Sequence, residues 1–114
     1  MHEMAIAEGI IQVISEKLKE QDSKARVKKV HLKIGKLTCV EPEALRLSFE
    51  ILARETPLEK SSLHIKSVAI TGKCKECGKN LKLTKLDFAC PECGSFRLEI
   101  RTGREMFIES FEIE

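Results

Sequence analysis

The sequence predicts an α+β fold: a two-layer α/β unit in which two helices cover a small three-stranded sheet, with a cysteine-rich module inserted before the last strand. Three observations support this prediction. Two segments space their apolar residues as helices do, three segments alternate as strands do, and residues 71–101 are rich in Cys, Gly, Pro and Lys. We therefore expect two domains, residues 1–70 plus 102–114 and the insert 71–101.

Both helices are predicted from apolar residues three and four positions apart. Residues 4–20 form an amphipathic segment of about four turns, with charged and amide side chains on the opposite side. Its apolar side contains Ile6, Ala7, Ile10, Ile11, Val13, Ile14 and Leu18. The second helix begins at Pro42, which suits the first helical position, and runs to about Arg54. Its main apolar stripe contains Leu45, Ser48, Phe49 and Leu52, with Ala44, Leu47 and Ile51 beside it.

Three segments have the two-residue period of a strand. Val30, Leu32 and Ile34 alternate with polar residues, which predicts a strand with one wet face. Residues 62–70 predict a second strand, whose alternation slips near Ser67 as at a β-bulge. Residues 103–114 predict the last strand, so the chain returns to the first domain after the insert.

Composition excludes several classes of protein. The 114 residues include 20 Lys or Arg and 18 Asp or Glu, a formal charge of +2 with mixed signs, which offers no large basic field for nucleic acid. No apolar run is long enough for a membrane span, and the start lacks the features of a signal peptide. We therefore expect a cytoplasmic protein without a membrane or nucleic-acid partner.

Four of the five cysteines form two CxxC pairs. Cys74 and Cys77 lie in C-K-E-C-G, and Cys90 and Cys93 lie in C-P-E-C-G, with 12 residues between the pairs. A two-residue spacer lets both sulfurs of a pair turn toward one point, and four thiolates surround Zn²⁺ as a tetrahedron. A glycine after each pair allows the left-handed backbone that turns the chain. In a reducing compartment this pattern predicts metal binding rather than disulfides.

We expect the insert to be a zinc ribbon with a structural zinc ion, because four thiolates leave no open coordination position. An iron ion in a rubredoxin-like site is the chemical alternative. The functional alternative is a ribbon that binds nucleic acid or another protein. Seven basic and four acidic residues in 71–101 give +3, and zinc tetrathiolate contributes −2, so a charge of about +1 argues against nucleic acid.

The amino terminus offers a second metal site. The α-amino group of Met1 and the backbone and Nδ1 nitrogens of His2 can chelate one ion, with Glu3 or a distant histidine as a further donor. A planar set of nitrogens favours Ni(II) or Cu(II) over Zn(II). The chelate needs Met1 to remain, which we expect because His2 is a large second residue. The alternative is a solvated terminus with Glu3 favoured by the helix dipole.

An enzyme is the interpretation from another class. Cys39 and His31 could form a nucleophile and base, but no orienting Asp or Asn and no Gly-rich oxyanion loop accompany them. We therefore expect no enzymatic activity and an inert Cys39 in the turn between strand and helix. His31 and His64 are expected to be solvated strand residues, although either could complete a nickel site.

Several motifs occur together in order along the chain. They are M-H-E-M at the start, H-L-K-I-G-K-L from His31, V-E-P-E-A-L from Val40, F-E at Phe49, T-P-L from Thr56, the paired CxxC and G-R-E from Gly103. In these motifs the sequence resembles the HypA family of hydrogenase nickel-incorporation proteins over essentially its whole length.

The resemblance implies a nickel metallochaperone that supplies Ni²⁺ to the [NiFe]-hydrogenase large-subunit precursor together with a nickel-linked GTPase, HypB. It implies that Met1, His2 and Glu3 bind nickel as transient cargo and that Cys74, Cys77, Cys90 and Cys93 bind structural zinc. We expect a monomer or a weak homodimer. No histidine flanks either CxxC pair here, so exchange of a zinc thiolate for imidazole lacks a local ligand.

Overall fold

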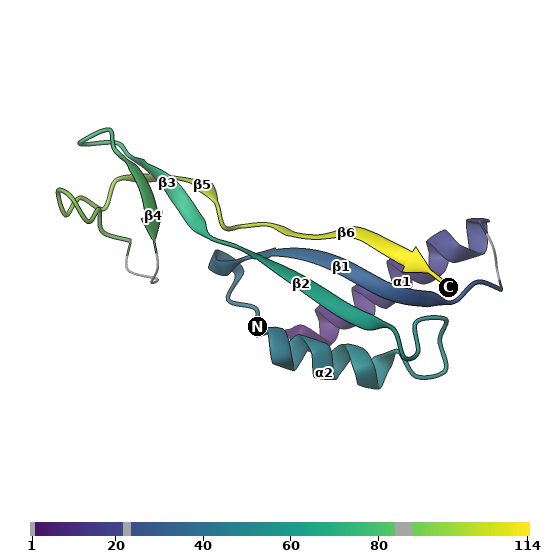
Figure 1. Cartoon of the computed structure of the whole chain (residues 1–114). Helices are drawn as coiled ribbons and strands as arrows, with labels where there is room; N and C mark the ends of the chain where they lie inside the picture. The colour runs from purple at the N-terminus through teal and green to yellow at the C-terminus, as the bar shows by residue number, and fades with distance from the viewer. Residues whose placement is uncertain (1, 22–23, 84–87) are drawn as a thin grey trace. The chain divides into compact units, whose positions relative to one another are not determined.

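The computed structural model describes residues 2–21, 24–83 and 88–114. Two α-helices and six strands are found there, in two three-stranded sheets of order β2-β1-β6 and β4-β3-β5 (Figure 1). The elements are α1 (Glu3–Gln21), β1 (Val27–Gly35), the 3-10 turn η1 (Lys36–Thr38), α2 (Pro42–Leu52), β2 (Ser62–Val68), β3 (Ile70–Cys74), β4 (Asn80–Leu83), β5 (Leu98–Thr102) and β6 (Met106–Ile113). The predicted α+β class, with two helices and a three-stranded sheet, is confirmed.

The chain divides into two compact units, which are described separately. The first unit comprises Met1–Leu32, Val40–Lys66 and Phe107–Glu114, and the second comprises Lys33–Cys39 and Ser67–Met106. The second unit therefore contains the segment 33–39 in addition to residues of the predicted insert. Within the described part of the chain, no helix is long and apolar enough to cross a bilayer.

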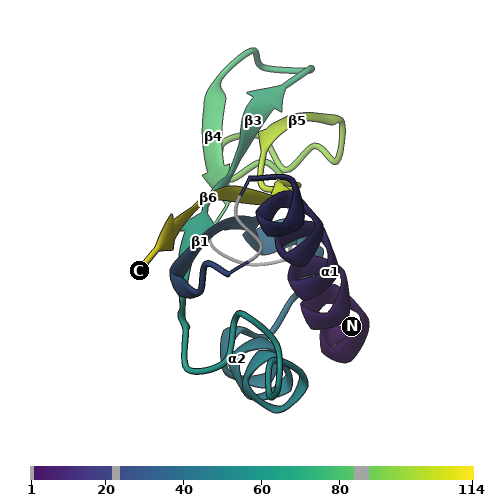
Figure 2. The ribbon, with the colours of Figure 1, turned by 90° about the vertical axis from the view of Figure 1, so that its right-hand side faces the viewer.

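In the first unit, α1 and α2 pack against each other and lie on the same side of the strands (Figures 1 and 2). The core side chains of α1 are Ala7, Ile10, Ile11, Ile14 and Leu18, as the helical period predicts. Val13, by contrast, is 48% exposed. Burying the aliphatic stripe removes apolar area from water at roughly 25 cal/mol per Å², and this holds the helices on the sheet.

Helix α2 begins where the sequence predicts. Pro42 takes an early helical position, and the Glu41 carboxylate accepts hydrogen bonds from the backbone N–H groups of Glu43 and Ala44 at 3.2 and 3.5 Å. This arrangement satisfies two donors that an uncapped helix would leave unpaired. The buried face of α2 carries Leu45, Ser48 and Phe49, whereas Leu47 and Ile51 are exposed.

Strand β1 places its apolar residues on the helix side. Val30, Leu32 and Ile34 are buried, and the alternating residues Lys29, His31 and Lys33 are only partly buried. The predicted half-buried strand is therefore confirmed. Its polar side forms the open face of the sheet, where β2 and β6 lie on either side of β1.

The second unit is built on β3, which pairs antiparallel with β4 on one side and β5 on the other. The predicted strand 62–70 is in fact two strands, because β2 ends at Val68 and β3 then runs from Ile70 to Cys74. A register shift lies between Thr71 and Gly72 in the pairing with β5, so the irregularity falls beyond Ser67. Strand β3 thus leads directly into the first CxxC pair.

Candidate metal centre

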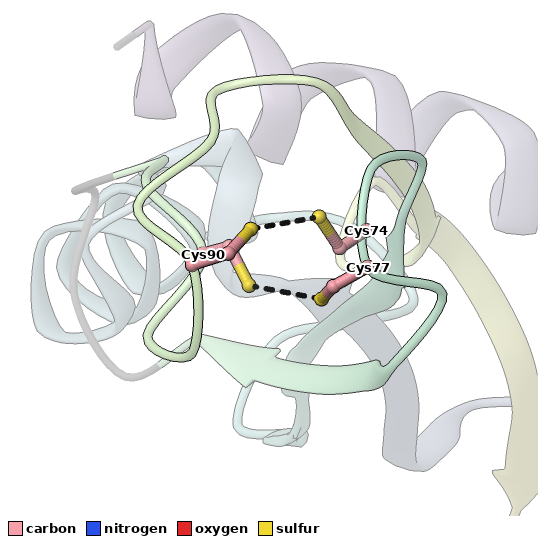
Figure 3. Close-up of side chains that lie close together, drawn as sticks. Cys74, Cys77 and Cys90 are labelled. Atoms are coloured by element: carbon pink, nitrogen blue, oxygen red, sulfur yellow. Dashed lines mark hydrogen bonds between the residues drawn. The ribbon is translucent and has the colours of Figure 1, made fainter.

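The four cysteines of the two CxxC pairs converge on one point in the second unit. Their Sγ atoms all lie within 4.8 Å of one another, and none forms a disulfide. The Cys74 and Cys93 sulfurs are 3.6 Å apart, and those of Cys77 and Cys90 are 3.7 Å apart. In Figure 3 the side chains of Cys74 and Cys77 point across the site toward Cys90.

These separations fit a tetrahedral metal ion. Four sulfurs at about 2.3 Å from Zn²⁺ lie about 3.8 Å from one another, close to both values above. A disulfide would need an S–S distance of about 2.05 Å. The donor set therefore fits a thiolate-binding ion such as zinc and leaves no ligand position for a substrate.

Two matching backbone turns position the sulfurs. The N–H of Gly78 donates to the carbonyl of Cys74 at 2.9 Å, and the N–H of Gly94 donates to that of Cys90 at 2.8 Å. Both glycines have φ of +76°, in the left-handed region that residues with a Cβ rarely adopt. The prediction that these glycines turn the chain is confirmed.

Within the cluster, the pKa values of Cys74 and Cys93 shift in opposite directions. The backbone N–H of Cys77 is the main cause that lowers the pKa of Cys74 to about 7. The backbone N–H of Ser95 lowers the pKa of Cys93, but desolvation and the thiols of Cys74, Cys90 and Cys77 outweigh it and raise that pKa to about 12. Four thiolates this close repel one another, so a cation is needed to hold them all ionised.

Among the described residues, the apolar cluster around these cysteines is small. Cys74, Leu81 and Cys90 form a small buried cluster, with Leu98 packed against it. The ion pairs Lys79–Glu92 and Arg97–Glu76 are largely exposed and contribute little. So small an apolar core contributes little folding free energy by itself.

The amino-terminal candidates lie in the first unit. Met1 lies outside the described residues, so only His2 and Glu3 can be placed. The His2 carbonyl accepts from the N–H of Ile6 at 3.1 Å, which starts α1. The Glu3 carboxylate accepts from the N–H of Glu41 at 3.2 Å, a contact that lowers its pKa. The exposed side chain of His2 borders a cavity of about 520 Å³, which is lined by His2, Glu3, Met4, Ala5, Ala44 and Ser48.

Cys39 lies in the second unit, at the end of the 3-10 turn between β1 and α2, as predicted. Its exposed thiol donates to the Leu37 carbonyl at 3.7 Å. It borders a cavity of about 460 Å³ whose other lining residues are Leu37, Phe88, Phe96, Leu98, Ile100 and Arg104. Among the described lining residues there is no base or carboxylate that could activate a nucleophilic cysteine.

Sequence reasoning missed one group of side chains in the first unit. His31 Nε2 and Glu112 Oε2 are 2.6 Å apart, and the rings of His31 and His64 lie 5.2 Å apart. The hydrogen bond from His31 is the main cause that lowers the pKa of Glu112. Alternation along the strands predicts that both histidines face away from the core, but only strand pairing brings them together.

Comparisons with known proteins agree with these features. The family model described as "Hydrogenase/urease nickel incorporation, metallochaperone, hypA" matches residues 1–113. The hydrogenase maturation factor HypA of Desulfatibacillum aliphaticivorans is 40% identical over 113 residues, 99% of this chain and 87% of that protein. HypA 1 of Bradyrhizobium diazoefficiens is 38% identical over 114 residues, the full length of both chains.

Two solved structures of HypA proteins also match this chain. The solution structure of a HypA protein matches with a TM-score of 0.69 and 26% identity, covering 100% of this chain and 97% of that one. The nickel metallochaperone HypA of Helicobacter pylori matches with a TM-score of 0.63 and 26% identity, covering 99% and 97%. The family is one of metallochaperones, not enzymes. This chain belongs to the HypA family of hydrogenase/urease nickel-incorporation metallochaperones.

Proposed function

We propose that this chain binds Ni(II) at its amino terminus as cargo and delivers it during maturation of a [NiFe]-hydrogenase, while a zinc ion on Cys74, Cys77, Cys90 and Cys93 holds the second unit folded. Nickel binding belongs to the domain of residues 1–70 plus 102–114, and zinc binding to residues 71–101. The family assignment carries this proposal, and the His2–Glu3 geometry supports it.

Nickel is held by nitrogen donors from two consecutive residues. The α-amino group of Met1 and the backbone nitrogen and Nδ1 of His2 close two adjacent chelate rings in one plane. Such a set selects Ni(II) or Cu(II), for which tetragonal nitrogen coordination is favourable. The His2 side chain is exposed and no helix N–H bond requires its backbone nitrogen, so the chelate can form without unfolding α1.

Glu3 supplies a nearby donor to the nickel ion and also positions the start of α1. Its carboxylate is held by the N–H of Glu41, and Glu41 in turn caps α2. This contact connects the first turn of α1 to the start of α2 and so fixes the position of Glu3. The His2 side chain is exposed, so an acceptor protein can displace it from the nickel ion.

The zinc ion serves stability and not transfer. Four sulfur ligands complete its coordination, and two of them, Cys74 and Cys90, are buried. Because these thiolates must stay reduced, we place the protein in the cytoplasm. Its partners are the nickel-linked GTPase HypB and the hydrogenase large-subunit precursor.

Calorimetric titration of untagged, zinc-loaded protein with Ni(II) tests the proposal. We expect one nickel per chain in the wild type, and a loss of affinity of about 100-fold or more in His2→Ala, because even an outer-shell change costs 10–100-fold. An added amino-terminal Gly-Ser extension should have the same effect, since it moves the α-amino group away from His2.

Glu8→Gln is the matched control for the His2 variant. Glu8 is an exposed residue of α1 and supplies none of the proposed nickel donors, so the nickel affinity of this variant should stay unchanged. Zinc content should stay at one per chain in every variant. Nickel affinity that is unchanged in both His2→Ala and the extended protein would refute the amino-terminal site.

A further inference from the structure

We propose that His31 and His64 form a second, weaker transition-metal site on the open face of the β2-β1-β6 sheet, with Glu112 as the carboxylate that orients His31. The site takes a divalent ion that accepts imidazole nitrogen, such as Cu(II), Ni(II) or Zn(II). It is separate in sequence from both the amino-terminal donors and the four cysteines.

Three neighbouring strands bring these side chains together. His31 lies on the central strand β1, His64 on β2 and Glu112 on β6. The two ring centroids are 5.2 Å apart with an angle of 31° between the ring planes. Two imidazoles that bind one ion at about 2.1 Å with a tetrahedral angle have centroids about 5 Å apart, so the two rings already stand at a suitable spacing.

The hydrogen bonds leave the same nitrogen free on each ring. His31 Nε2 is held by Glu112 Oε2 at 2.6 Å, and His64 Nε2 lies 3.0 Å from Ser62 Oγ. Among the residues that the structure describes, neither Nδ1 atom has a hydrogen-bond partner. When Nε2 donates to the carboxylate, Nδ1 carries the lone pair, which is the arrangement that carboxylate–histidine–metal sites use.

The exposure of the two histidine rings and the positive charge near them determine the metal affinity expected for this site. The His31 side chain is 33% exposed and His64 is exposed, so a hydrated ion can reach both rings. Lys29 and Lys33 share the open side of β1 with His31, and Lys66 shares that of β2 with His64. Their positive charge opposes a cation, and only two nitrogens bind it, so the affinity should be below that of the amino-terminal chelate.

The test uses the full chain with His2→Ala and one equivalent of zinc on the cysteines, so that neither of the other sites competes. Zn(II) is then added while the ring nitrogen resonances of the histidines are followed by NMR and the stoichiometry by calorimetry. We expect about one further zinc per chain and a shift of the Nδ1 resonances of both His31 and His64.

Single variants distinguish a metal site from a structural contact. His31→Gln and His64→Gln should each weaken this second binding at least 10-fold, and Glu112→Gln about 10-fold. Lys29→Gln should strengthen it severalfold by removing a positive charge, a result that a merely structural role for these residues does not predict. Thermal melting of each variant checks that the sheet remains folded.

Some results would overturn the proposal. These are no zinc beyond the first equivalent in the His2→Ala protein, extra zinc that leaves both ring signals unmoved, or weakening in only one of the two histidine variants. The NMR measurement needs no change at the site itself, so it decides the question even if a histidine variant does not fold.

Discussion

Replacing Gly94 by alanine measures how strongly the backbone of the second CxxC turn contributes to metal binding. Gly94 has φ of +76°, and a Cβ added there would have no atom within 4 Å. Gly78 stands in the same conformation with the same open space. The substitution therefore adds no steric clash with neighbouring residues, and only the left-handed backbone opposes it.

The left-handed conformation costs a residue with a Cβ about 1–2 kcal/mol. Because zinc binding and folding of the small unit are linked, this cost lowers the apparent zinc affinity. At about 1.4 kcal/mol per factor of ten, Gly94→Ala should weaken zinc binding by about 5- to 30-fold. Gly94→Asn should give an affinity between those of the wild type and Gly94→Ala, because asparagine enters the left-handed region more readily than alanine.

Competition with a chromophoric zinc chelator gives the affinity of each variant. Gly9→Ala is the matched control, since Gly9 lies inside α1 and its added Cβ also meets no atom within 4 Å. It should leave zinc affinity unchanged and stabilise the first unit by about 0.5–1 kcal/mol. Equal zinc affinity for the wild type, Gly94→Asn and Gly94→Ala would show that folding and zinc binding are not coupled through this turn.

Three further predictions concern the stability of the two units. Cys90→Ser should unfold residues 71–101 and spare the two-layer domain; backbone amide chemical shifts preserved throughout 71–101 would contradict this. Ile14→Ala removes a side chain with 0% exposure and should lower the free energy of unfolding by about 2–5 kcal/mol in urea denaturation, whereas the exposed control Val13→Ala should change it by about 0.5 kcal/mol or less; similar losses in both would disprove the assigned helix face. Gly35→Ala places a Cβ onto the backbone carbonyl of Gly103, so its melting temperature should drop by several degrees, and an unchanged temperature would argue against this close approach.

The helices were the most predictable part of the fold. The helical period and Pro42 predict α1 and α2 to within a residue or two of Glu3–Gln21 and Pro42–Leu52. The pattern could not predict which of the apolar residues on each helix are buried against the sheet. Val13, Leu47 and Ile51 have apolar side chains but remain exposed, because burial depends on the neighbouring layer and not on the helix alone.

The short strands of the second unit were not predictable from alternation. β4 has four residues and β5 has five, too few for a clear period among so many charged side chains. The CxxC pairs nevertheless predicted that four sulfurs would meet, because that result depends on local spacing and on the chemistry of thiolates.

The pair His31 and His64 on the open face of the sheet was only partly predictable from the sequence. Alternation in β1 correctly predicts that His31 faces away from the core. Its contact with Glu112, 81 positions later, depends on which strands pair and in which register. A single sequence contains that information only indirectly.

Anomalous diffraction from crystals of the untagged protein, soaked with Ni(II) and measured on both sides of the nickel edge and of the zinc edge, locates each metal ion separately. We expect a nickel peak at the ring nitrogen of His2 and a separate zinc peak among the sulfurs of Cys74, Cys77, Cys90 and Cys93. Nickel density confined to the sulfurs or to the histidine pair, with none beside His2, would contradict this expectation.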